Sequence, residues 1–319
     1  MKYLLYVVFF LLLFSCEEKS NLDEEIAKVE VEIAIERFDK EFAATTPETL
    51  TATKEKYPIF FPKQFNDSVW IQRIEDTLQQ ELNREVQKVF PNNDFIEDEL
   101  YDVFQHIKYY FPEFKAPIVY TTTSDVDYQN KVILADSILV IGLDTYLGAE
   151  HYFYEGIPLY ISQNLKKEQL DEDVATAYAK QLIKVPSKNN LLSLMVYYGK
   201  ELYLKDIWLP ENTDAEKIGY TKEQMDWAND NEEYIWRNFI ENELLYSTNQ
   251  KLPARFINPA PFSKFYLEID NESPGMTGRF IGWQIVRAFM NNTDTTVKEL
   301  MLINEEELFN QSKYKPKKN

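Results

Sequence analysis

Residues 118–143 decide the fold class, and they read IVYTTTSDVDYQNKVILADSILVIGL. Three β-prone runs lie within this stretch, at 118–122, 132–134 and 138–143, and turns that contain Asp separate them. Runs rich in Val, Ile, Thr and Tyr between polar turns are typical of short strands. We therefore predict a small β-meander of about three strands here.

The rest of the sequence is mostly helical in pattern. Apolar residues repeat at helical spacing from Leu78 to Val89, which predicts a helix over residues 67–90. Asp94 is a candidate N-cap for a second helix that ends at Pro112. Farther along the chain the same spacing predicts helices at 150–163, 171–183, 188–206, 221–245, 277–291 and 296–302.

The organisation of the chain favours one domain. Apolar residues alternate with other types from Val29 to Ile35, which predicts a further strand, and a helix is expected to begin near Asp39. No internal repeat, low-complexity linker or shift in composition marks a second domain. We predict an α+β fold, a predominantly helical single domain over residues 26–319 with the small β-meander.

The N-terminus has the features of an export signal. The apolar run Tyr3–Phe14 is too short to cross a bilayer, which takes about 20 residues, but it has the length of a signal-peptide core. It ends at Leu13-Phe14-Ser15-Cys16, which resembles a bacterial lipobox. We predict a signal peptide over residues 1–15, lipidation of Cys16 and a polar tether to residue 25. The alternative is an ordinary thiol in a membrane anchor helix.

Composition limits the partners. The net charge of −19 argues against a nucleic-acid partner, and it places membrane attachment on the N-terminal lipid instead of on a basic patch. Cys16 is the only cysteine, so no intramolecular disulfide can form. We expect a lipid-anchored protein of the cell envelope, on the periplasmic face or at the outer membrane.

The most unusual local sequence is Ser273–Val286, which holds three of the eight glycines. Gly275 is expected in a turn with positive φ. Gly278 and Gly282 are four residues apart, so they form a bare strip on the following helix where another element can approach closely. Arg279 lies beside this strip, where the helix N-terminus could hold an anion. The simpler alternative is that Arg279 pairs with a buried carboxylate.

Two further helical stretches carry polar residues in apolar surroundings. Gly199 inside a helix costs about 1 kcal/mol relative to alanine, which predicts close packing against another backbone. Its neighbour Lys200 is expected to snorkel or to pair. Glu232 lies near the start of a helix, where acidic residues are favourable in any case.

Metal and hydrolase chemistry find little support. The chain has two histidines, His106 and His151, and no His-Glu-x-x-His motif. Glu150, His151 and Glu155 make a poor zinc set, since catalytic zinc usually takes three ligands rich in His. No Gly-x-Ser-x-Gly elbow occurs. We predict no metal and no cofactor.

Several motifs together resemble the gliding-motility lipoprotein family GldB of the Bacteroidetes. They are the lipobox, Tyr198-Gly199-Lys200-Glu201-Leu202-Tyr203, Gly219-Tyr220-Thr221, Ser273-Pro274-Gly275 and Ser312-Lys313-Tyr314-Lys315-Pro316. The resemblance implies an envelope lipoprotein that is required for gliding and works with the gliding and secretion machinery. It implies no catalytic residues.

A fainter resemblance to predicted zinc peptidases implies a zinc-metallopeptidase-like fold. In those proteins a His-Glu-x-x-His helix is expected near residues 171–183, but this stretch has no histidine here. The resemblance therefore implies a fold without the metal site.

These observations support two hypotheses about function. The first is a non-enzymatic lipoprotein that binds partner proteins through a groove formed by Gly275–Trp283, Tyr197–Tyr203 and Asn231–Trp236. Its site residues would be Gly275, Gly278, Gly282, Trp236 and a shared polar cluster of Arg279, Lys200 and Glu232. The alternative is a degenerate or unusual metallohydrolase in which Glu150, His151 and Glu155 supply the ligands. Stacking of a polysaccharide or lipid on Trp and Tyr is a third possibility, but core packing explains these residues more simply.

Overall fold

The computed structural model describes residues 21–186, 188–268 and 270–318. The predicted signal peptide and Cys16 lie outside these residues. Its helices and strands follow in chain order: β1 (Ala34–Glu36), α2 (Phe38–Ala43), α3 (Leu50–Lys56), α4 (Asp67–Glu75), α5 (Thr77–Val89), α6 (Asp94–Tyr110), β2 (Ile118–Thr122), β3 (Val132–Ala135), β4 (Ile138–Gly142), α7 (Leu159–Ser162), α8 (Leu170–Leu182), α9 (Leu191–Trp208), α10 (Asp214–Ile218), α11 (Lys222–Asp230), α12 (Glu232–Glu241), α13 (Leu252–Phe256), α14 (Thr277–Asn292), α15 (Val297–Leu302) and α16 (Glu305–Ser312).

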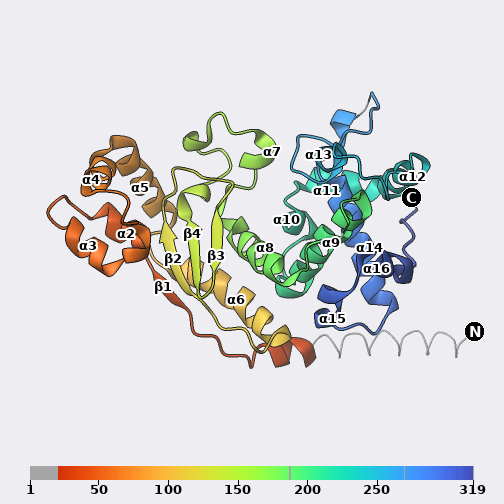
Figure 1. Cartoon of the computed structure of the whole chain (residues 1–319), viewed down its shortest axis with the longest axis horizontal. Helices are drawn as coiled ribbons and strands as arrows, with labels where there is room; N and C mark the ends of the chain where they lie inside the picture. The colour runs from red at the N-terminus through yellow and green to blue at the C-terminus, as the bar shows by residue number, and fades with distance from the viewer. Residues whose placement is uncertain (1–20, 187, 269, 319) are drawn as a thin grey trace, which may run out of the picture.

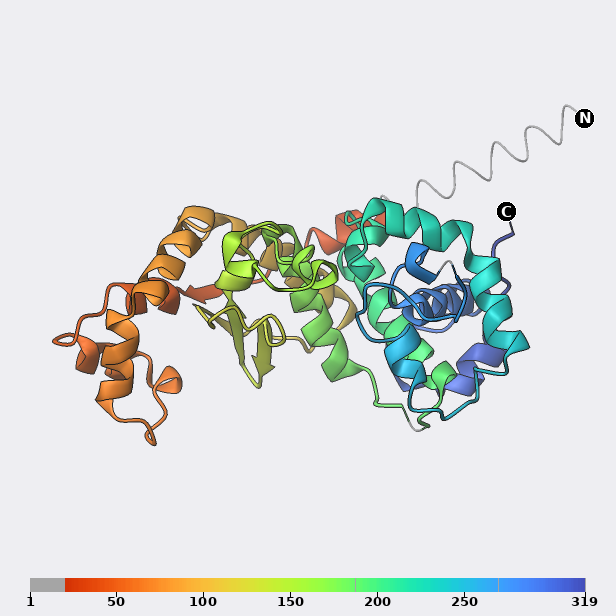
Figure 2. The ribbon, with the colours of Figure 1, turned by 90° about the horizontal axis from the view of Figure 1, so that it is seen from above.

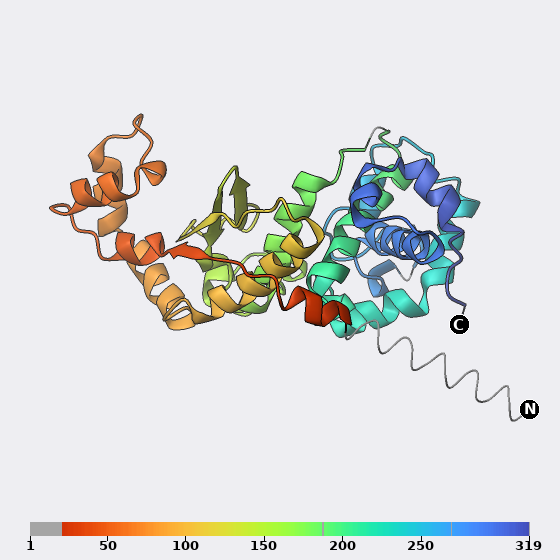
Figure 3. The same ribbon diagram turned by 90° about the horizontal axis from the view of Figure 1, so that it is seen from below.

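The molecule is elongated, with the sheet near its middle (Figure 1). Helices α2–α5 form a lobe at one end, and helices α9–α16 form a compact body at the other. The views from above and below show the same arrangement (Figures 2 and 3). The main hydrophobic core extends from Leu82 to Leu308, and a smaller aromatic cluster around Phe38 and Phe61 fills the lobe. The predicted α+β class with a helical majority is confirmed.

The strands pair differently from the predicted meander. The order is β1-β2-β4-β3, with β2 parallel to both β1 and β4, and β3 antiparallel to β4. In a meander β2 would have paired with β3. Leu139 and Ile141 of β4 are fully buried, whereas no residue of β3 is, so burial favours β4 at the centre and β3 at the edge. The strand expected at residues 29–35 is observed only over Ala34–Glu36, and the backbone oxygens of Val29 and Glu30 accept hydrogen bonds from Gln105 and Lys108 of α6.

Several predicted helices are confirmed and others are divided. The helices predicted near 94–112, 171–183, 188–206, 277–291 and 296–302 correspond to α6, α8, α9, α14 and α15. The helix predicted at 67–90 is broken at Asp76, whose carboxylate caps α5 by accepting from the amides of Leu78 and Gln79. The helix predicted at 221–245 is divided at Asn231.

The prediction for residues 150–163 was wrong. This segment contains only a short 3-10 turn, η3 (Tyr152–Tyr154), and the single turn α7. Gly156 has φ of +88°, and Pro158 follows it, so the backbone cannot continue as a helix between them. None of the helices in the described ranges is long and apolar enough to cross a membrane.

Candidate functional site

Helices α9 and α14 cross with their backbones in close contact. A Cβ atom at Gly282 would collide with the Met195 carbonyl group, and one at Gly199 would collide with Gly282. At Gly278 an added Cβ would lie 2.8 Å from the Phe256 carbonyl oxygen. The predicted close packing of these helices is confirmed. All three glycines are buried, so they hold the body together and do not line an open groove.

The turn before α14 differs in detail from the prediction. Met276, not Gly275, has the positive φ, at 57°. Gly275 is needed for a different reason, because a Cβ there would collide with the backbone of Ala260. The Tyr220 hydroxyl donates to the carbonyl oxygen of Gly275. The residue in the left-handed conformation is therefore the neighbour of the glycine.

The predicted polar cluster is not assembled. The Nε atom of Arg279 donates to the Ile257 carbonyl oxygen at 2.6 Å, and its guanidinium group lies over the Tyr198 ring at 3.9 Å. Lys200 donates to the Ile303 carbonyl oxygen at 2.8 Å, and Glu232 accepts from the Tyr314 hydroxyl. Across the described residues, no hydrogen bond or ion pair joins Arg279, Lys200 and Glu232.

Two of the predicted site residues, Glu232 and Trp236, contact the same third residue, Tyr314. The Trp236 ring packs edge-on against the Tyr314 ring at 5.2 Å, and the hydroxyl of that tyrosine binds Glu232. Tyr314 is half-buried and belongs to the segment after α16. Glu232 and Trp236 therefore fix the C-terminal segment to α12.

Lys200 gives the first testable prediction. Its side chain is only 2% exposed, and burial lowers its pKa from 10.5 to about 8, against the opposing charge of Glu305. The unfolded chain therefore binds more protons than the folded chain between pH 8 and 10.5, so stability should rise with pH in this window, by up to about 1.4 kcal/mol per unit. The variant Lys200→Met should lack this rise.

Urea unfolding of the wild type and Lys200→Met at pH 7, 8 and 9.5 measures this difference. The variant should be at least as stable as the wild type at pH 7, because methionine carries no charge to desolvate. The free energy of unfolding of the wild type should rise relative to that of the variant as the pH increases. Parallel stability curves would show that the buried amine does not titrate in this window.

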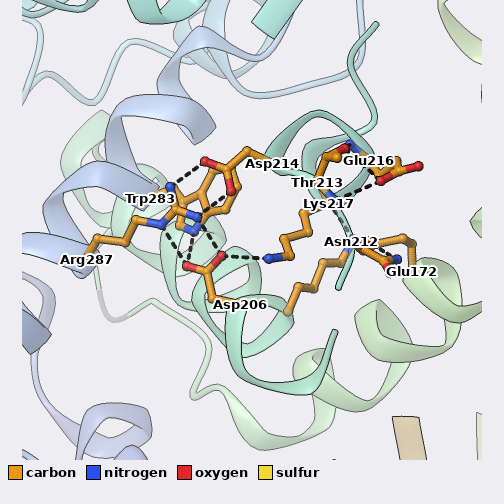
Figure 4. Close-up of polar contacts among 10 residues, drawn as sticks. Glu172, Asp206, Asn212, Thr213, Asp214, Glu216, Lys217, Trp283 and Arg287 are labelled. Atoms are coloured by element: carbon orange, nitrogen blue, oxygen red, sulfur yellow. Dashed lines mark hydrogen bonds and ion pairs between the residues drawn. The ribbon is translucent and has the colours of Figure 1, made fainter. Parts of the chain in front are cut away.

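A polar network in the body joins α9, α10 and α14 (Figure 4). Asp206 accepts hydrogen bonds from Trp283 and from Arg287, and it pairs with Lys217 at 3.4 Å. Arg287 also binds Asp214 through both of its Nη atoms. The sequence reasoning missed this network, since its members are up to 81 residues apart and no local motif joins them.

A second buried network occupies α8, the helix where the peptidase resemblance would place metal ligands. Glu172 pairs with Lys205 of α9 at 3.1 Å, and Asn212 donates to both Asp171 and Glu172. Burial, followed by the charge of Glu172, raises the pKa of Asp171 to about 7. These carboxylates link α8 to α9 and to the segment before α10.

The histidines are not gathered with acidic residues into a metal site. Nε2 of His151 lies 3.4 Å from Glu85, and its ring stacks on Tyr152 and Phe153. Nδ1 of His106 contacts the Asp102 carbonyl oxygen within α6. Within the described ranges, no group of three His, Cys, Asp or Glu side chains could hold a metal ion. The proposed set of Glu150, His151 and Glu155 is therefore not assembled.

An open apolar groove lies on the lobe, between α4, α5 and the loop after β2. Its volume is about 690 Å³. Phe65, Val69 and Leu78 line it, and all three are exposed. At the rim Arg73 pairs with Asp125 at 2.9 Å. Sequence reasoning missed this groove because α4 and α5 were predicted as one continuous helix.

The fold and these networks define a helix-rich α+β protein whose body is joined by buried ion pairs. The family described as gliding motility protein GldB matches residues 19–316, so the chain belongs to this family of gliding-motility lipoproteins. The predicted family resemblance is thus confirmed over nearly the whole chain. No curated protein and no solved structure matches it.

Proposed function

We propose that this chain is a non-enzymatic lipoprotein of the gliding machinery and that it binds a partner protein through the groove on the lobe. Family membership supports the role in gliding. The proposed anchor is the lipid on Cys16, which would hold the protein in the cell envelope on the periplasmic face or at the outer membrane. The groove is the observation that carries the proposed mode of action.

The groove suits an amphipathic helix of a partner. Phe65, Val69 and Leu78 have exposed fractions of 46%, 42% and 64%, and they line one surface. Apolar side chains gathered in this way on a water-exposed surface often mark a protein interaction site. A helix with apolar residues on one face can bury them in such a groove, while Arg73, Asp76 and Asp125 at its edges contact polar residues.

The polar residues of α8 fit a structural role better than a catalytic one. Glu172 is buried and neutralised by Lys205, and Asp171 is held by Asn212. Removing Lys205 would leave the buried charge of Glu172 unpaired, which is strongly destabilising. Removing Asn212 would leave Asp171 without its side-chain hydrogen-bond donor. The contacts of these acids therefore explain their presence without a reaction. The metallohydrolase alternative would require metal bound in stoichiometric amount to the purified protein.

The proposed role is tested by single-cell movement on glass. A deletion strain should stop gliding, and the wild-type gene should restore movement. The double variant Val69→Glu/Leu78→Glu should reach the membrane fraction in normal amount but should not restore movement, because charges buried at the centre of an interface weaken binding by roughly 100-fold or more. The control is Leu302→Glu, which replaces a leucine that is also exposed but lies on α15.

The outcomes separate the parts of the proposal. Normal gliding by the deletion strain would remove the role in motility. Full restoration by Val69→Glu/Leu78→Glu would remove the groove as the partner site. Failure of Leu302→Glu as well would show that any charged residue on the surface is harmful, so the loss could not be assigned to the groove.

A further inference from the structure

A polar cavity lies between the sheet side of the molecule and the helical body. Its volume is about 240 Å³, and residues of α8, α9, α10 and the start of α14 line it. Its charged lining residues are five basic and two acidic: Lys131, Lys180, Lys205, Lys217 and Arg279, with Asp173 and Glu201. This excess of basic groups is notable because the chain has a net charge of −19.

Some of these charges are used by the fold. Lys131 pairs with Asp173, Lys205 pairs with Glu172, and Lys217 pairs with Asp206. Lys180 is exposed, and in the described part of the chain it has no hydrogen bond or ion pair. The charged lining residues without an ion pair of their own are therefore Lys180, Arg279 and Glu201. The charge of Glu201 still acts on the buried ammonium group of Lys205 and helps to raise its pKa.

Glu201 is the least expected member of this group. This residue is only 4% exposed. The Oε2 atom of its carboxylate is buried, yet it accepts no hydrogen bond from any described residue. Buried carboxylate oxygens in folded proteins almost always accept hydrogen bonds. Glu201 also lines the cavity, so a positively charged group of a ligand bound there would lie near its carboxylate.

Arg279 presents the complementary group. Its Nε atom is bound to the Ile257 carbonyl oxygen and its plane rests on Tyr198, so the guanidinium group is held in one orientation. Neither of its Nη atoms has a hydrogen-bond partner among the described residues. A guanidinium group fixed in this way can bind a carboxylate through two parallel hydrogen bonds.

The two groups are brought near each other by α9. Tyr198 and Glu201 are three residues apart on this helix, so they lie on the same face in consecutive turns. Arg279, which stacks on Tyr198, is therefore close to the turn that carries Glu201. Both side chains line the same small cavity.

We propose that this cavity binds a small zwitterion of the free amino acid class. The ligand carboxylate would bind Arg279, with Lys180 nearby, and its ammonium group would bind Glu201. The volume of about 240 Å³ is below the range of roughly 300–1,000 Å³ for drug-sized ligands, and it suits a molecule of this size. This site is separate from the groove on the lobe and does not depend on the proposed role in gliding.

Calorimetric titration of the full chain in detergent micelles tests the proposal. The probes are the standard free L-amino acids, followed by the N-acetyl and the amide derivatives of the amino acid that binds best. Each derivative lacks one of the two charges and should bind at least about tenfold more weakly, since charge-assisted hydrogen bonds are the strong ones. Absence of saturable binding by every amino acid would overturn the proposal, and so would equal binding of the derivatives.

Variants assign the two charges to residues. Glu201→Gln should weaken binding of the free amino acid at least about tenfold but leave the affinity of the N-acetyl derivative unchanged. Arg279→Lys should weaken binding of the free amino acid but leave the affinity of the amide derivative unchanged. The matched controls are Glu233→Gln and Arg237→Lys, which alter an exposed pair of the same two types on α12. Normal binding by both cavity variants would overturn the proposed site. If a variant does not fold, the affinities of the two derivatives for the wild-type protein test the proposal.

Discussion

The variant Gly282→Ala is expected to lower the free energy of unfolding by about 3 kcal/mol or more. Overpacking in a core usually costs about 1–3 kcal/mol, and here the added methyl group meets the Met195 carbonyl group instead of a side chain that could rotate away. Alanine gains about 1 kcal/mol over glycine in helix propensity, which offsets only part of the cost. The two helices must move apart, and Phe280, Trp283 and Val286 would lose their fully buried packing.

Urea unfolding followed by circular dichroism measures this loss. The control is Gly142→Ala, at another glycine with an ordinary φ of −80°. There the nearest atom to an added Cβ would be the Ser124 hydroxyl oxygen at 3.0 Å, which belongs to a small side chain that can adjust. We expect a change within about 1 kcal/mol at this position. Similar losses at the two glycines would contradict the importance of the helix crossing.

The sequence was most informative where one helix carries its own pattern. The periodic apolar residues predicted α6, α8, α9 and α14 nearly to their ends, because each of these helices buries much of its own apolar surface. The cost of Gly199 inside a helix predicted a close backbone contact, and Gly282 provides it. Both predictions used only the sequence of the helix concerned and did not depend on the identity of a distant residue.

The sequence was least informative where a partner lies far along the chain. The parallel pairing of β2 with β4 depends on which strand becomes most buried, and the β-prone runs alone do not determine this. The contacts of Arg279 with Tyr198 and Ile257 were likewise not predictable, since a guanidinium group can stack on an aromatic ring or donate to a carbonyl oxygen as well as pair with a carboxylate. The expected polar cluster failed for this reason.

The variant Asp206→Asn is expected to cost about 3 kcal/mol, the lower end of the range for breaking one side of a buried ion pair. Its carboxylate accepts from Trp283 and twice from Arg287, and it is the ion-pair partner of Lys217. Lys217 is buried, so neutralising Asp206 removes its ion-pair partner. Its charge is then left with the more distant carboxylate groups of Asp214 and Glu216. Arg287 would retain Asp214 as its only ion-pair partner.

Urea unfolding of a set of variants separates the causes of this loss. Asp214→Asn should cost about 1 kcal/mol or less, because the Asp214 side chain is 40% exposed and Arg287 keeps Asp206. The double variant Asp206→Asn/Lys217→Met should be more stable than Asp206→Asn alone, since it removes the charge that the first substitution leaves unpaired. If the second substitution adds to the loss instead, the hydrogen bonds to Trp283 and Arg287, and not the charge of Lys217, account for the contribution of Asp206.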